Sequence, residues 1–328
     1  MNLTTLKETP QFKEAVLELI EKEFGYDSSN SFEVDFYPLI NDSNHEHCHI
    51  LIENNRLVAH IGALKRHYQI EENTFDFMMY GGIAVASEFQ GQGNFKKLFE
   101  HVLSLYQDST FHLLWSDKID LYKKFSFFPC IELHQYQGKD NKEAFPRLYQ
   151  IKQSYLIDLD NQTLLKIKDL YQSSKELRPH RDEKHWQDLT CITSAKIYLI
   201  YKDDELVNYF IKDKGQDLTN IIHEYGTISK EYLSIMLNYG IVWSPQVFSN
   251  NETLFAALLK IGNFKKFSQF VKAYSPLQIN EIDEDIVFKF KENSHAETHE
   301  GFLQGLFGPG KFEEFSTSPL LIPGLDSI

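Results

Sequence analysis

The segment from Gly82 to Phe99, GIAVASEFQGQGNFKKLF, constrains the fold more than any other part of the chain. An apolar run typical of a buried strand ends at Gln90-Gly91-Gln92-Gly93, and an amphipathic helix begins immediately afterwards. A strand that enters a helix through glycines leaves backbone N–H groups unpaired at the helix start, where the helix dipole adds about half a positive charge. The segment therefore predicts an anion site without Lys or Arg, and a turn without a ligand is the alternative.

The segment is not one of the two commonest phosphate-binding loops. The dinucleotide fingerprint needs G-x-G-x-x-G and an acidic residue about 20 positions further on. A Walker A loop needs Gly-Lys-Ser/Thr, which does not follow Gly93.

The first 150 residues predict one mixed α/β layer, of the α+β kind, rather than a regular βαβ repeat. Apolar periodicity and turn residues mark out its elements. The expected elements are a helix at 10–24, strands at 49–52, 57–64 and 74–86, a helix after Gly93, a strand at 111–116, a short helix capped by Ser116-Asp117 and a strand at 128–136.

The second half repeats this order in weaker form, so the predicted domains are 1–150 and 151–328. Within 151–275 we expect a degenerate second copy, followed by a tail to Ile328. Its expected elements are a helix at 161–172, a hairpin at 196–212, a helix between Ser229 and Gly240, a strand at 241–243, a capped helix at 251–262 and a strand at 267–274.

The first half resembles the GNAT superfamily of N-acetyltransferases, whose acetyl-CoA loop reads Gln/Arg-x-x-Gly-x-Gly/Ala between a strand and a helix. Residues Gln90 to Phe95 fill this frame, with Phe95 in place of Gly or Ala. The segment LYKKFSF at 121–127 is similar to the family's aromatic-Tyr-x-x-x-Gly-Phe segment, with Ser126 in place of Gly. The resemblance implies the GNAT acyl-CoA N-acyltransferase fold in two tandem copies.

The resemblance also implies roles for individual residues. Tyr122 matches the proton donor to the departing CoA thiolate, and a phenol is protonated at neutral pH. Gly81-Gly82 would leave room for the thioester, or form a bulge without a ligand. The acetyl-CoA-binding residues implied are Ile83, Ala84, Val85, Gln90, Gly91, Gln92, Gly93, Asn94 and Phe95.

The base that accepts the amine proton is less clear. The strand segment MMY holds no carboxylate where some relatives carry Glu. Some tandem members of the family place their C-terminal carboxylate in the active site, which makes Ile328 a candidate catalytic residue. The other candidates are Tyr80, His60, His67 and Glu53.

Composition excludes several other classes. A formal net charge of -14 disfavours a nucleic-acid binder and favours a cationic amine substrate. No apolar run is long enough to span a membrane, and three widely spaced cysteines indicate a cytoplasmic protein. His45, His47 and His49 are expected to be solvated residues on one strand face, with no metal site.

The sequence thus predicts an acetyl-CoA-dependent N-acetyltransferase that acts on a primary amine of a small molecule or protein. The second copy lacks the glycine loop and a matching tyrosine, so it is expected to shape the acceptor cleft. The alternative is a CoA-binding or interaction module without turnover, which Phe95 and the missing carboxylate base favour.

Overall fold

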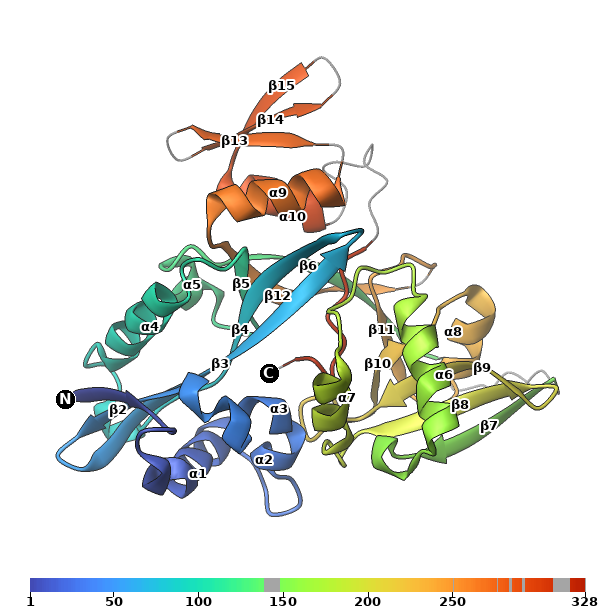
Figure 1. Cartoon of the computed structure of the whole chain (residues 1–328), viewed down its shortest axis with the longest axis horizontal. Helices are drawn as coiled ribbons and strands as arrows, with labels where there is room; N and C mark the ends of the chain where they lie inside the picture. Colours follow the sequence, from blue (N-terminus) through green and yellow to red (C-terminus); the bar gives the residue numbers. More distant parts are fainter. Residues whose placement is uncertain are drawn as a thin grey trace.

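The computed structural model describes residues 1–138, 148–249, 251–275, 277–282, 285–290, 293–308 and 319–327. Within them, twelve strands form one mixed sheet that runs through both halves of the chain (Figure 1). Their order is β1 (Asn2–Thr5), β2 (Cys48–Glu53), β3 (Arg56–Ile70), β4 (Asn73–Val85), β5 (Phe111–Leu114), β12 (Glu252–Ile261), β6 (Phe128–Tyr136), β11 (Ile241–Ser244), β10 (Ile221–Tyr225), β9 (Glu205–Lys212), β8 (Lys196–Lys202) and β7 (Tyr149–Ser154).

Helices cover both faces of this sheet. Along β2, Ile50 and Ile52 pack with the first helices while Leu51 packs on the opposite face, as the two-residue period of a strand requires. The helices of the first half are α1 (Lys13–Phe24), α2 (Phe32–Asp35), α3 (Tyr37–Ile40), α4 (Asn94–Leu105) and α5 (Ile119–Lys123). Those of the second half that cover this sheet include α6 (Asn161–Gln172), α7 (Glu183–Thr190) and α8 (Lys230–Met236).

The two halves exchange strands at the centre of the sheet. Strand β12, from the second half, pairs with β5 through Leu258↔Leu114 and Leu259↔Leu113. Strand β6, from the first half, pairs with β11 through Val242↔Tyr136. Because β12 and β6 also pair with each other, each half carries a strand that completes the other. The division at residue 150 stays a prediction, and the structure shows that strands from both sides of it interleave.

Two predicted elements are wrong. The expected capped helix at 251–262 is strand β12, and the expected strand at 267–274 lies in helix α9 (Phe264–Tyr274). In β12, Ala257, Leu258 and Leu259 are all buried because the strand is covered on both faces, so its sequence does not alternate. In α9, Phe267, Phe270, Val271 and Tyr274 follow a helical period, and Asn263 caps the helix by accepting the Lys266 N–H.

Other predicted elements of the second half are confirmed: the helix at 161–172 is α6, and the hairpin at 196–212 is β8 and β9. The first half agrees as closely, with the Asn54-Asn55 turn of the β2–β3 hairpin in the left-handed region.

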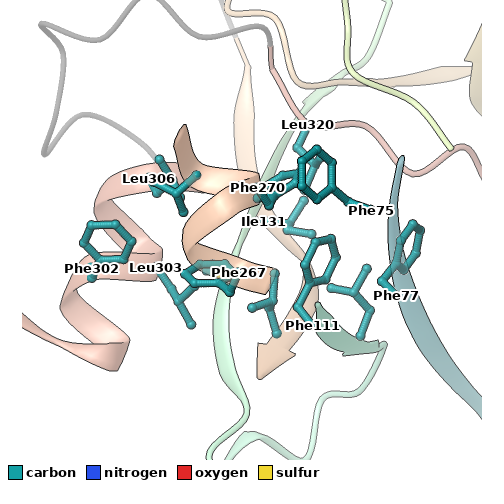
Figure 2. Close-up of a cluster of buried hydrophobic side chains, with 14 of the residues drawn as sticks. Phe75, Phe77, Phe111, Ile131, Phe267, Phe270, Phe302, Leu303, Leu306 and Leu320 are labelled. Atoms are coloured by element: carbon teal, nitrogen blue, oxygen red, sulfur yellow. The ribbon is translucent and has the colours of Figure 1, made fainter. Parts of the chain in front are cut away.

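The expected tail carries structure of its own. Strands β13 (Gln278–Ile282), β14 (Asp285–Phe290) and β15 (Asn293–Thr298) form a small sheet, followed by helix α10 (His299–Phe307). Figure 2 shows Phe267 and Phe270 of α9 and Leu303 of α10 directed toward Phe75, Phe77 and Phe111 of the large sheet. This cluster attaches the small sheet to the first half.

The last described segment, 319–327, returns to the middle of the molecule. Leu320 forms a parallel bridge with Leu177, with the Leu177 N–H donating to the Pro319 carbonyl at 2.9 Å. Figure 1 shows the chain ending between the two halves of the sheet. Within the described ranges, no helix combines the length and the apolarity that crossing a membrane requires.

We predict that Leu259→Ala lowers the free energy of unfolding by about 2–5 kcal/mol, because the substitution leaves a cavity where the two halves share strands. Leu259 is 0% exposed. Urea unfolding followed by circular dichroism and by tryptophan fluorescence measures this, and both signals should shift together. Leu165→Ala, at a side chain that is 60% exposed, is the control and should change the value by under about 0.5 kcal/mol. Separate transitions for the two signals would contradict the shared core.

Candidate active site

Strand β4 separates from its neighbour at the point where the site begins. It pairs with β5 only from Phe77 to Tyr80, so residues 81–85 continue beyond the end of β5. The register against β3 shifts between His60 and Gly62, and Gly82 has φ +58°, which marks a β-bulge. Gly82 also lines a pocket, and a Cβ there would meet Ile20 and Phe32 at 3.1 Å. Gly82 therefore forms a bulge and lines the pocket, and its role in making room for a thioester stays a prediction.

The loop after β4 requires glycine at two positions. Gly91 has φ +72° and Gly93 has φ +80°, both in the left-handed region. Side-chain amides brace the loop: Gln90 Nε2 donates to the Val85 carbonyl and Gln92 Nε2 to the Glu88 carbonyl, each at 3.0 Å. The buried Asn94 donates to the Phe89 carbonyl at 3.0 Å. These amides fix the loop that the sequence predicted as an anion site.

Helix α4 begins with unpaired N–H groups. Gly93 is its N-cap and supplies no side chain, and the first helical bond runs from the Lys97 N–H to the Gly93 carbonyl. Within the described part of the chain, no side chain accepts a hydrogen bond from the N–H groups of Asn94, Phe95 and Lys96. The positive end of the helix dipole is therefore available to an anion.

Two pockets adjoin this loop. The β4 pocket, of about 600 Å³, is lined by residues 80–85 and 115–118 together with Gln90, Phe95 and Tyr122. The loop pocket, of about 410 Å³, is lined by Gly91, Gly93, Asn94 and Lys96 among others. Both contain Val85, Gln90 and Phe95. Apart from Gln92, whose side chain braces the loop, the residues predicted to bind acetyl-CoA thus line two pockets that share Val85, Gln90 and Phe95.

Tyr122 reaches the β4 pocket from helix α5. Its side chain is 5% exposed, and burial raises the pKa of its phenol well above the ordinary value. The predicted Ser116-Asp117 cap is wrong: the N-cap of α5 is Lys118, whose backbone N–H donates to Ser116 Oγ at 3.0 Å. Ser126, where the related segment has Gly, has φ +63°, a conformation that normally favours glycine.

Phe95 has a packing role that the sequence did not reveal. Its ring stacks on Phe99 with centroids 5.2 Å apart and meets Tyr122 edge-on at 5.8 Å. Phe95 therefore forms part of the wall that positions Tyr122.

A third pocket lies between the two halves. This interhalf pocket, of about 680 Å³, takes its lining from both halves and from Ile322, Gly324 and Ser327 of the C-terminal segment. It shares Phe36, Trp115, Ser116, Asp117 and Asp217 with the β4 pocket. A molecule in the interhalf pocket would therefore adjoin one in the β4 pocket.

Asp117 and Asp217 are carboxylates at this junction that the sequence did not single out. Burial raises the pKa of Asp217, and Asp35 adds to the increase while Lys214 opposes it. The two residues are 100 positions apart, so only the tertiary structure brings them together.

The other candidate bases occupy varied places. Tyr80 lines the β4 pocket, and its hydroxyl lies 2.9 Å from His112 Nδ1. His60 Nδ1 lies 2.7 Å from the Gly82 carbonyl, and burial lowers its pKa to about 4. His67 packs against His180 and lines a different pocket. Glu53 lies at the β2–β3 turn and lines none of the three pockets described. Ile328 lies outside the described residues.

Two of the three alternating histidines are buried and His47 is partly exposed, which corrects the expectation that all three are solvated. His45 and His49 are buried, and His45 Nε2 lies 3.1 Å from the Ile40 carbonyl. His47 and His49 both contact the Tyr106 hydroxyl, at 2.9 and 2.8 Å. The described residues contain no cluster of side chains suited to a metal ion.

A buried ionic cluster holds the C-terminal segment in place. Arg181 donates to Asp326 Oδ2 at 2.6 Å and to both carboxylate oxygens of Glu224, and it stacks on Tyr171 and Trp186. His185 Nε2 lies 2.8 Å from Asp326 Oδ1. Burial disfavours the charged form of Asp326. Arg181 and His185 nevertheless hold the pKa of Asp326 well below its usual range.

Lys214 adds a second tether from the interhalf pocket. It is 1% exposed, and its Nζ donates to the Gly324 and Ser327 carbonyls at 2.8 and 2.6 Å. Burial lowers the pKa of Lys214 to about 7. Arg181 and Lys214 thus fix the residues that line the pocket next to the chain end.

The second half lacks an open helix start at the equivalent place. Helix α8 follows β10, and its N-cap Ser229 accepts the Tyr232 N–H at 3.2 Å. Its own side chain therefore occupies the position that an anion would take.

Comparisons with known proteins identify a family for the first part of the chain and a fold for most of it. Residues 7–130 match the family model described as an acetyltransferase (GNAT) domain. This part of the chain belongs to the GNAT superfamily of acetyltransferases. The search of curated proteins returned no match.

Solved structures share the GNAT fold over most of the chain. A probable N-acyltransferase from Enterococcus faecalis superposes with a TM-score of 0.62 at 12% identity, covering 90% of this chain and 85% of the other. A GCN5-related N-acetyltransferase from Anabaena variabilis gives 0.62 at 13% identity, covering 92% and 89%. A tandem GNAT protein from the clavulanic acid biosynthesis pathway gives 0.52 at 10% identity, covering 80% and 98%.

We predict that Asp326→Asn destabilises the protein by about 3–5 kcal/mol at pH 7, because it leaves Arg181 without one of its two buried carboxylates. The folded pKa of Asp326 is depressed, so its contribution is present above the unfolded pKa of about 3.9 and is lost as pH falls below it. Urea unfolding should show a smaller difference in the free energy of unfolding between the variant and wild type at pH 3.5 than at pH 7. Asp169→Asn, on the exposed face of α6, is the control, and an equal effect of the two variants would contradict the anchor.

Proposed function

We propose that the protein is an acetyl-CoA-dependent N-acetyltransferase that transfers the acetyl group directly to a primary amine. The observation that carries this proposal is a pair of pockets that share part of their lining. The two pockets adjoin the N–H groups at the start of α4, the end of β4 that extends beyond β5, and the Tyr122 side chain.

The residues present fit acetyl-CoA. The N–H groups of Asn94, Phe95 and Lys96 would hold the pyrophosphate at the positive end of the helix dipole. Residues Ile83 to Val85, beyond the end of β5, would bond to the amides of the pantetheine arm. The thioester supplies an activated acyl group, and its position in the β4 pocket would adjoin the interhalf pocket.

The proposed reaction forms one bond and breaks one. The amine nitrogen attacks the thioester carbonyl, a carbon–nitrogen bond replaces the carbon–sulfur bond, and the sulfur leaves as a thiolate. Tyr122 donates its proton to that sulfur, and a base accepts a proton from the amine nitrogen. The raised pKa keeps Tyr122 protonated until negative charge develops on the sulfur. The base is the C-terminal carboxylate of Ile328 or a carboxylate at the pocket junction.

The acceptor is proposed to be cationic, with no nucleic acid or membrane as partner and a location in the cytoplasm. The net charge of -14 supports an amine over an anionic polymer. The three cysteines are free, as a reducing compartment would leave them.

Acetyl-CoA titration followed by a thiol-release assay tests this function with Tyr122→Phe. We expect the dissociation constant for acetyl-CoA to stay within about twofold and kcat to fall by about 10², because the variant lacks the phenolic proton. Tyr201→Phe, on strand β8 of the second half, is the control and should retain kcat. Binding without thiol release by the wild type would favour a CoA-binding module, and no binding would refute the proposal.

The proposed role of Ile328 is tested by adding one alanine after it. The extension moves the terminal carboxylate by one residue, so turnover should fall by about 10² or more if that carboxylate is the base. Tethering at Asp326 should persist, and an unchanged melting temperature would confirm it. Full turnover by the extended chain would exclude the terminal carboxylate and favour Asp117 or Asp217 as the base.

A further inference from the structure

The interhalf pocket is chemically divided in a way that bears on the identity of the acceptor. Most of its wall is apolar, whereas its acidic residues, Asp117 and Asp217, lie where it meets the β4 pocket. The apolar lining comes from Trp115, Leu133, Leu218, Trp243, Leu258 and Ile322.

The apolar wall is held firmly. Trp243, on β11, donates its indole N–H to Gln135 Oε1 on β6 at 2.9 Å. Leu258 is buried on β12, within the strands that the halves exchange. An aromatic or branched group could pack here without rearrangement of the wall, whereas an ammonium group would lose its hydration without gaining a partner.

The basic groups of the pocket are already engaged. All three acceptors of Lys214 Nζ, two carbonyls and the Ser327 hydroxyl, belong to the C-terminal segment. His223 Nε2 lies 2.8 Å from the Asp213 carbonyl, and burial lowers the pKa of the ring to about 4, so it is neutral at pH 7. Across the described residues, neither Asp117 nor Asp217 forms an ion pair with a Lys or Arg. These carboxylates remain open to an incoming cation.

We propose that the acceptor is a monoamine with an aromatic or branched apolar body. Its nitrogen lies against Asp217 at the junction, and its body packs against Trp243 and Leu258. Asp217 and Trp243 are the specificity-determining residues. This inference rests on the proposed function for the transfer itself, but amine binding can be measured without it. Polyamines and aminoglycosides, which carry charge along their length, would be poor acceptors because they would place ammonium groups against the apolar wall.

Phenethylamine, spermidine and ethylamine are the probes for turnover. We expect kcat/KM for phenethylamine to exceed that for spermidine by about tenfold or more. Trp243→Ala should lower the value for phenethylamine by about tenfold and leave that for ethylamine within about twofold. Asp217→Asn should raise KM for phenethylamine by about tenfold, with Asp204→Asn, on the exposed β8–β9 turn, as control. Preference for spermidine, or an equal effect of Trp243→Ala on all amines, would overturn the proposal.

Binding separates this inference from the proposed function. Two of the three tryptophans, Trp115 and Trp243, line the pocket, so non-fluorescent phenethylamine should change the emission of the protein without acetyl-CoA. Saturable binding that Asp217→Asn weakens by about tenfold, without thiol release, would support the pocket and refute the transferase. Thiol release with spermidine but no phenethylamine binding would support the transferase and overturn the pocket assignment.

Discussion

The arrangement of the site depends on the buried guanidinium of Arg181. It joins Glu224 on β10 to Asp326 in the C-terminal segment and lies between the rings of Tyr171 and Trp186. Two carboxylates offset the cost of burying this charge, and either carboxylate alone would leave the group poorly compensated. Because Asp326 lies two residues from Ile328, this cluster and the Lys214 tether together hold the C-terminal segment where it lines the interhalf pocket.

The exchanged strands impose a second constraint. Strand β12 supplies Leu258 to the interhalf pocket while pairing with β5, whose end exposes the last residues of β4. The wall for the acceptor and the opening for acetyl-CoA are therefore set by the same central strands. A shift of one half against the other would alter both pockets together, which makes the halves one structural unit for the proposed chemistry.

Local patterns predicted those parts of the fold that local forces determine. Alternation, turn residues and caps identified the hairpins and α6, and the glycine loop identified the start of α4. The run ETLFAALLKI could not be assigned by periodicity, because a strand buried on both faces resembles a buried helix. Nor could sequence bring Asp217 beside Asp117, or Asp326 to Arg181, because those contacts depend on the tertiary fold. From the sequence, Phe95 was only a departure from the family motif. The structure shows that its ring packs on Tyr122.

The two halves share a framework but differ in how the helix after the corresponding strand begins. In α4 the N-cap is a glycine with φ +80°, and the first N–H groups are left for a ligand. In α8 the N-cap is Ser229, whose hydroxyl accepts one of those N–H groups itself. Ser229 thus satisfies one N–H group of α8, whereas the glycine cap of α4 provides no side chain for the corresponding group. The second half instead contributes Trp243, Asp217 and Lys214 to the wall of the interhalf pocket. Lys214 also holds the C-terminal segment in place there.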